Sequence, residues 1–204
     1  MTIKELHNLY EISHRELLLS IGTTLGVLIL GVLPGVLLAV ALSLFWLLTV
    51  VSRPHDGVLG RVKGIKGFHN LADFPDATTI PGLILFRFEA NLVFFNADYF
   101  RDRLRATIAA AKTPVEWVVV DASSINVIDI TALQKIDELR EELAAQGIVL
   151  ATARAKRNLM KSFNHDWGVK RRELHARYHF DTIKSAVRAF NNRVEKGVSP
   201  GTDS

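Results

Sequence analysis

Apolar residues dominate one continuous stretch near the start of the chain. From Leu17 to Val51 there are 35 residues without Asp, Glu, Lys, Arg or His. A helix needs about 20 apolar residues to cross a bilayer, so the stretch is long for one span and short for two. The Pro34-Gly35 pair in its middle is typical of a turn. We predict a transmembrane or re-entrant helical hairpin over residues 17–51, with a single tilted or kinked span as the alternative.

Beyond residue 78, short apolar runs alternate with amphipathic segments, which is the pattern of an α/β domain. Asn96 is predicted to be a helix N-cap. The run 117–120 is continuously apolar, as expected for a central strand covered on both faces. We predict strands at 83–88, 92–95, 117–120, 148–151 and 177–179, and helices at 97–111, 131–146, 154–163 and 182–194. Residues 78–196 then form one α/β domain with a small mixed sheet and about four helices, followed by a disordered tail at 197–204.

Residues 52–77 connect these two parts and show no sustained period. The segment is rich in Gly, Pro, Lys and Asp. Its glycines lie near Lys63 and Lys66, but the spacing of a phosphate-binding P-loop is missing. We therefore predict a flexible linker over residues 52–77.

Basic residues on both sides of the apolar stretch predict its orientation. His14 and Arg15 precede it, and Arg53 and Arg61 follow it. Positive flanks are typical of cytoplasmic loops, so both ends are predicted to lie in the cytoplasm, with residues 1–16 as a cytoplasmic lead. Small residues at spacings of four, five and four allow close helix approach and predict packing against other membrane helices; they are Gly22, Gly26, Gly31 and Gly35.

Composition excludes several kinds of chemistry. The chain has no cysteine, which excludes disulfides, thiolate zinc sites, iron–sulfur clusters and cysteine nucleophiles. From residue 53 onwards there are 23 basic and 18 acidic residues. A basic stretch from Arg154 to Arg172 favours an anionic membrane surface, or simple solvation, over nucleic acid, since no groove-reading motif accompanies it.

The segment from Asp121 to Leu133 carries the strongest local pattern. Asp121 ends the predicted central strand, Asp129 follows eight residues later, and Thr131 opens the next helix. By itself this spacing indicates a turn residue followed by a helix cap at Asp129 or Thr131.

This segment resembles the signature loop of STAS domains, which are named for sulfate transporters and anti-sigma-factor antagonists. The order of elements from Gly82 to Val194 also follows that fold. Upstream, Ser13–Glu16 and Gly31–Ser43 resemble the last membrane segments of sulfate permease (SulP) transporters, and residues 52–61 resemble the junction before their STAS domain. The resemblance implies the C-terminal part of a sulfate or inorganic anion transporter, in the inner membrane with its regulatory domain in the cytoplasm.

Two departures from the family qualify this prediction. In anti-sigma-factor antagonists the residue after the second Asp is the phosphorylated Ser or Thr, and here it is Ile130. Thr131 is one residue late, so it is predicted to be a cap first and a phosphoacceptor only as the alternative. The family's transport core is not encoded in these 204 residues, so the chain is predicted not to transport by itself.

The remaining candidates give no catalytic or cofactor site. We find no nucleophile with a base and an orienting group, and His165, His175 and His179 have no carboxylate at a metal-binding interval. The predicted partners are the membrane helices of a transport core, lipid, and another protein or a second copy bound through the STAS domain. The rival hypothesis is a membrane-tethered signalling module that binds protein partners around Asp129.

Overall fold

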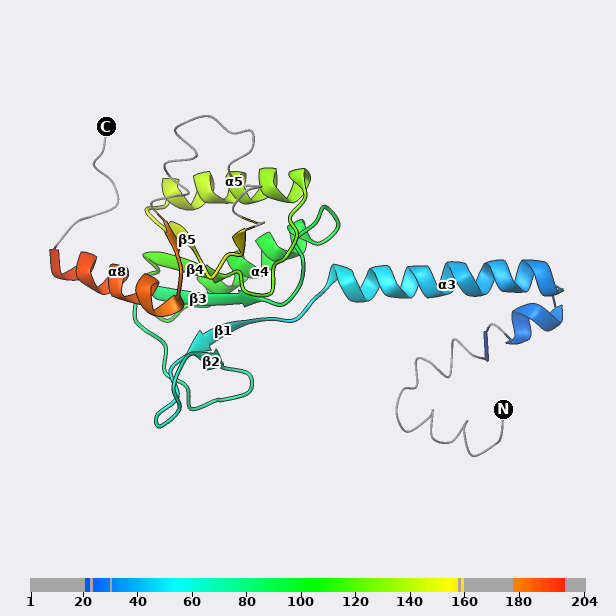
Figure 1. Ribbon diagram of the computed structural model, residues 1–204, viewed down its shortest axis with the longest axis horizontal. Coiled ribbons are helices and arrows are strands. Elements are labelled where there is room, and N and C mark those ends of the chain that lie inside the picture. The colour runs from blue at the N-terminus through cyan, green and yellow to red at the C-terminus, as the bar shows by residue number, and fades with distance from the viewer. Residues whose placement is uncertain (1–20, 23, 30, 158, 160–177, 197–204) are drawn as a thin grey trace. The chain divides into compact units, whose positions relative to one another are not determined.

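The computed structural model describes residues 21–22, 24–29, 31–157, 159 and 178–196 (Figure 1). The chain divides into two compact units between Ser52 and Arg53. The predicted lead and tail lie outside the described residues. Most of the predicted helix at 154–163 does so too, together with His165, His175 and the second half of the basic stretch.

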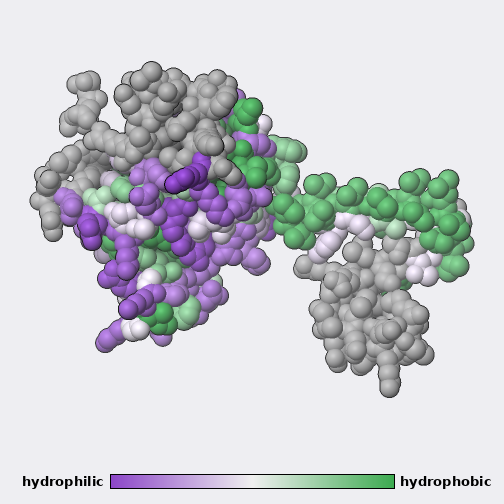
Figure 2. Space-filling model, viewed as in Figure 1, coloured by the Kyte–Doolittle hydropathy of each residue, from purple (hydrophilic) through white to green (hydrophobic). Residues whose placement is uncertain are grey.

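The first unit contains one long apolar helix, α3 (Val32–Ser52). Its 21 residues are long and apolar enough to cross a membrane. Figure 2 shows that α3 is hydrophobic along its length. Residues 24–29 form a preceding helical segment, and the helix is interrupted at Gly31, which has φ +89°. A Cβ added to Gly35 would lie 2.5 Å from Cγ2 of Val27, so the preceding segment packs closely against the start of α3.

The turn predicted at Pro34-Gly35 is therefore wrong in position. The interruption lies at Gly31, where glycine adopts a left-handed backbone at low cost. Pro34 is the third residue of α3, where its missing N–H removes no bond within the helix. Gly35 continues the helix, since its N–H donates to the carbonyl of Gly31 at 3.0 Å, and its lack of a side chain permits the contact with Val27.

The second unit is built around a six-stranded mixed sheet with strand order β2-β1-β3-β4-β5-β6. Strands β3 to β6 are parallel, and β1 is antiparallel to both its neighbours. The predicted α/β fold with a small mixed sheet is confirmed. The strands are β1 (Asp56–Gly60), β2 (His69–Asn70), β3 (Leu83–Phe88), β4 (Trp117–Asp121), β5 (Val149–Ala153) and β6 (His179–Phe180), and the helices are α4 (Ala97–Ala109), α5 (Ile130–Ala145) and α8 (Ile183–Lys196).

Helices cover both faces of the sheet. Alternate strand residues such as Phe86, Val118 and Val120 share a buried cluster with residues of α4 and α5. Their neighbours Leu85 and Val119 belong to a second cluster with residues of α8. Figure 1 shows α5 and α8 on opposite sides of the strands. The continuous apolar pattern of β4 follows from burial on both faces.

The predicted linker at 52–77 is wrong for part of its length, because β1 and β2 belong to the sheet. Leu59 in β1 is 1% exposed. Gly57 gives no hydrophobic signal, and a Cβ there would lie 2.5 Å from Nδ2 of Asn70. Strands of five and two residues with glycine at contact positions are too short to show a period, which is why the pattern indicated a linker.

A buried carboxylate fixes the start of β1 to α4. The Asp56 side chain is 4% exposed. It accepts hydrogen bonds from the Tyr99 hydroxyl at 3.0 Å and from Nε of Arg103 at 2.9 Å. Burial, and then the hydrogen bond to Asp56, raise the pKa of Tyr99. Asp56, four positions after the last residue of α3, is therefore fixed to α4.

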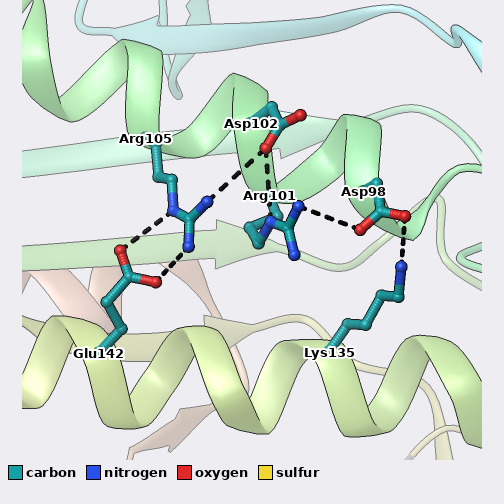
Figure 3. A network of polar contacts seen from close by, with 6 residues as sticks. All are labelled: Asp98, Arg101, Asp102, Arg105, Lys135 and Glu142. Carbon is teal, nitrogen blue, oxygen red and sulfur yellow. Dashed lines mark hydrogen bonds and ion pairs between the residues drawn. The ribbon is translucent and has the colours of Figure 1, made fainter.

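Helices α4 and α5 are connected by ion pairs along their exposed sides (Figure 3). Arg105 pairs with Glu142, with Nε at 3.0 Å from Oε1, and Lys135 pairs with Asp98. Arg101 lies 3.2 Å from Asp98 on the same helix. Exposed pairs of this kind stabilise little, so their main effect is on the alignment of the two helices.

Candidate functional site

The predicted signature loop lies at the carboxyl edge of the sheet. Because β3, β4 and β5 are parallel, their last residues meet at one edge, with Arg87 opposite Asp121 and Asp121 opposite Ala153. The loops that follow β3 and β4 start there. In open α/β sheets this edge is the usual place for a binding site.

Asp121 is the buried centre of this edge and is 1% exposed. Its carboxylate accepts hydrogen bonds from Nε of Arg87 and Nε of Arg154, both at 2.9 Å, and from the backbone N–H of Ser123 at 3.2 Å. A second guanidinium nitrogen of Arg154 also pairs with it. Burial alone would raise the pKa of Asp121, but the bonds from Arg154 and Arg87 outweigh it and hold the pKa below the ordinary value of an aspartate. Asp121 therefore stays ionised and ties β3, β4 and the end of β5 together.

Arg154 takes an unusual backbone conformation to reach this carboxylate. Its φ is +59°, in the left-handed region that favours glycine. Its N–H donates to the carbonyl of Phe180 at 2.9 Å, and Nη2 donates to Oγ of Ser123 at 3.1 Å. The sequence prediction counted Arg154 with the basic stretch and missed its pairing with Asp121. The available signal was an arginine directly after an apolar strand that ends beside a buried Asp.

Asp129 connects the two loops of this edge. Oδ1 accepts the N–H of Ala132 at 2.8 Å, which makes Asp129 the N-cap of α5. Oδ2 accepts the N–H of Phe94, in the loop after β3, at 2.7 Å. One carboxylate thus satisfies a helix start and positions a residue 35 places away in the sequence.

The segment predicted as a strand at 92–95 is a loop in the structure. Only Leu92 forms a bridge, with Ile128, and its N–H donates to the carbonyl of Val127 at 3.0 Å. The Asn91 side chain accepts the N–H groups of Asn126 and Val127 at 3.1 and 3.2 Å. The apolar run misled the prediction, because it lies against the second loop instead of within the sheet.

Asn96 lies at the N-cap position of α4, but its side chain does not cap the helix. The buried side chain accepts the N–H of Val93 at 2.9 Å and donates to the carbonyl of Asn91 at 2.9 Å. The predicted cap residue therefore stabilises the preceding loop. Together with Asp129 and Asn91, it gives this edge a fixed backbone.

Thr131 is not the helix cap, which corrects that prediction. It is the second residue of α5 and is exposed. Ile130, at the position after the second Asp, is 73% exposed. The hydroxyl of Thr131 therefore contributes no cap, whereas the carboxylate of Asp129 does.

Replacing Asp129 and Thr131 one at a time should separate these roles. We expect Asp129→Ala to lower the free energy of unfolding by about 1–2 kcal/mol, through the lost cap and the unpaired Phe94 amide. We expect Thr131→Ala to change it by less than about 0.5 kcal/mol, as for an exposed position. Urea unfolding of the detergent-solubilised chain, followed by circular dichroism, measures both. Equal losses in the two variants would contradict the assignment of the cap.

The side chains at this edge hold the two loops in place and leave the outer surface of the loops available to bind a partner. Within the ranges that the structure describes, no group of three His, Asp or Glu side chains could hold a metal ion. His179 lies in β6, where burial lowers its pKa and the charge of Asp181 partly opposes this. The polar groups of the edge, Asp121 and Asp129, are engaged with arginines and backbone amides. What remains available to a partner is the outer surface of the two loops.

Comparison with known proteins identifies this unit. The STAS domain family matches residues 74–165. The chain contains a STAS domain. The match covers β3, α4, β4, α5 and β5, and therefore the whole edge built around Asp121 and Asp129.

Most of the chain, not only its STAS domain, is similar to sulfate transporters. It is 42% identical over 191 residues to a probable sulfate transporter of Mycobacterium tuberculosis, covering 94% of this chain and 34% of that protein. It is 30% identical over 161 residues to probable sulfate transporter 4.2 of Arabidopsis thaliana, covering 74% of this chain and 24% of the relative. The predicted resemblance to SulP transporters is confirmed. The chain spans about a third of the length of the mycobacterial relative.

A solved transporter structure shares the fold. The murine solute carrier 26 family member A9 anion transporter superposes with a TM-score of 0.78 at 18% identity, covering 93% of this chain and 31% of that chain. At this identity the match establishes the fold of the STAS-containing chain.

Proposed function

We propose that this chain is the C-terminal part of a SulP-type sulfate or inorganic anion transporter, which supplies final membrane helices and a cytoplasmic regulatory STAS domain. One observation carries the proposal: the 21-residue apolar helix α3 leads within four residues into the first strand of the STAS domain. A STAS protein that acts freely in solution has no use for such a helix. Similarity to sulfate transporters across 94% of the chain supports the same conclusion.

In this proposal the chain assists transport and does not carry the anion alone. The described groups of the domain edge are engaged with each other, as Asp121 with its arginines, and α3 is a single apolar helix without charged residues. The anion pathway would be built by other membrane helices, which pack against α3. The interruption at Gly31 and the close approach of Val27 to Gly35 support a hairpin. The basic residues on both sides of the apolar stretch support placing both ends in the cytoplasm.

Sulfate uptake in cells that lack their own uptake system tests this function. We expect this chain alone to give no uptake of radiolabelled sulfate above the empty vector. Joined to the remaining two-thirds of the mycobacterial relative, in place of that protein's matching segment, it should give more uptake than the remaining two-thirds alone. Uptake by the chain alone, or no gain from the joined protein, would refute the proposal.

Phosphorylation distinguishes the rival signalling hypothesis. An antagonist-type switch needs a hydroxyl directly after Asp129, and this chain presents the exposed Ile130 there. Thr131 is rotated from that position by about 100° on the helix. We expect intact-mass analysis of protein purified from its own host to show no stoichiometric phosphate on Thr131. Substantial phosphate there would favour the signalling module.

A further inference from the structure

Three apolar side chains are exposed together at the carboxyl edge of the sheet. Phe94 is 62% exposed, Val127 54% and Ile130 73%. They come from the loop after β3, the loop after β4 and the first residue of α5, and we call them the edge patch. Grouped apolar side chains on a surface indicate an interaction site more often than scattered ones do.

The backbone beneath the edge patch is rigidly connected. The N–H of Phe94 donates to Asp129, one residue before Ile130, at 2.7 Å. The carbonyl of Val127 accepts the N–H of Leu92 at 3.0 Å. The patch is thus held in one arrangement before any partner arrives, which lowers the entropy cost of binding.

Two exposed basic residues, Lys156 and Arg157, follow β5 at this edge. Lys156 donates to the Asn126 side chain, directly before Val127, and Arg157 is exposed. Among the described residues, four acidic groups of the domain are engaged: Asp121 by arginines, Asp129 by backbone amides, Asp98 by Lys135 and Asp56 by Tyr99 and Arg103. Glu89 and Asp181, which directly follow β3 and β6, are exposed. Apolar tips near Lys156 and Arg157, which form no ion pair with another described residue, match the chemistry of an anionic lipid surface.

The chain also enters the domain at this edge. Strand β1 is antiparallel to β3, with Asp56 opposite Phe88, so β1 begins where β3 ends. The carbonyl of His55 accepts the N–H of Glu89 at 2.9 Å. Only Arg53 and Pro54 separate this bond from Ser52, the last residue of α3. Of all parts of the domain, this edge therefore has the shortest covalent path to a bilayer that α3 crosses.

We propose that the edge patch binds the anionic surface of the bilayer, with Phe94, Val127 and Ile130 entering the headgroup region and Lys156 and Arg157 meeting lipid phosphates. This docking fixes which side of the STAS domain faces the membrane. The proposal rests on the membrane location of α3 given under Proposed function. A protein partner would be a different occupant, and the experiment separates the two.

The absence of cysteine in the chain allows a direct test. Single variants Val127→Cys and Ile130→Cys of the full chain are spin-labelled and reconstituted into vesicles of phosphatidylcholine, or of an equal mixture with phosphatidylglycerol. Lys112→Cys, an exposed position in the loop between α4 and β4 at the opposite edge, is the matched control. The readout is the ratio of collisions with oxygen, which concentrates in lipid, to collisions with a water-soluble nickel chelate.

We expect this ratio to rise at 127 and 130 in the mixed vesicles and to stay at its solution value at 112. Adding Lys156→Glu and Arg157→Glu should cancel the rise. Equal solution-like ratios at all three positions would overturn the proposal. Low collision rates with both reagents at 127 and 130, independent of lipid, would also overturn it and identify a protein contact. A label at Leu44→Cys in α3 reports separately on membrane insertion, so a failed patch and a failed membrane location are distinguishable.

Discussion

A fragment that starts at Ala77 is expected to show no cooperative unfolding, whereas the fragment from Arg53 to Lys196 should unfold in a single transition. The shorter fragment lacks β1 and β2. It loses the burial of Leu59, about 2 kcal/mol, and exposes the edge of β3 that pairs with β1. It also loses Asp56, the hydrogen-bond partner of Tyr99 and Arg103. These losses are a large part of the stability of a small domain.

Thermal and urea unfolding, followed by circular dichroism, compares the two fragments. Leu59→Ala in the longer fragment is the matched control, and we expect a loss of about 2–4 kcal/mol with the transition retained. If the shorter fragment unfolds with the same midpoint as the longer one, β1 is dispensable and the domain begins near residue 78, as the sequence pattern predicted.

Replacing Asp121 by Asn should be the most damaging single polar substitution at the domain edge. Asn keeps the shape of the side chain but leaves Arg87 and Arg154 without their carboxylate. Removing one partner of a buried ion pair costs about 3–5 kcal/mol, and the partial exposure of both arginines reduces this to about 2–3 kcal/mol. Asp102→Asn, at an exposed ion pair on α4, is the control and should change the unfolding free energy little.

The effect of Asp121 should depend on pH in a defined direction. The pKa of Asp121 is lowered in the folded protein. The ionised carboxylate therefore contributes its full share to the free energy of unfolding above the pKa of the unfolded state, about 3.9. This stabilisation is lost as the pH falls through the pKa of the folded state. Urea unfolding should therefore show a wild-type advantage over Asp121→Asn near pH 7 that shrinks below about pH 4. A difference independent of pH would mean that Asp121 acts through shape and not through charge.

The core of the domain was predictable from sequence because its signals are local. The run of apolar residues in β4 reflects its burial in the centre of the sheet. The spacing of Leu133, Leu139 and Leu143 reflects the packing of α5 in the buried cluster that it shares with the strands and α4. The signature loop was predicted from its resemblance to STAS domains, because the spacing of Asp121 and Asp129 by itself indicated only a turn and a helix cap.

What the sequence did not predict depends on contacts between distant residues. The pairing of Asp121 with Arg87 and Arg154 joins three strands, and the position of Arg154 directly after an apolar strand was the one sequence signal for it. The run at 92–95 is as apolar as a strand but is held by Asn91 and Asp129, whose partners lie in another loop. In the first unit, Pro34 gave the stronger turn signal, yet the first turn of a helix accommodates proline and the interruption falls at Gly31.

The left-handed backbone of Arg154 has a consequence for how this sequence can change over time. A residue other than glycine pays roughly 1 kcal/mol for that conformation, and here the guanidinium bonds to Asp121 offset it. If position 121 loses its carboxylate, arginine at 154 keeps the backbone cost without the compensation, and glycine becomes the better residue. The two positions should therefore vary together among homologues, with Arg accompanying Asp and Gly accompanying a neutral residue.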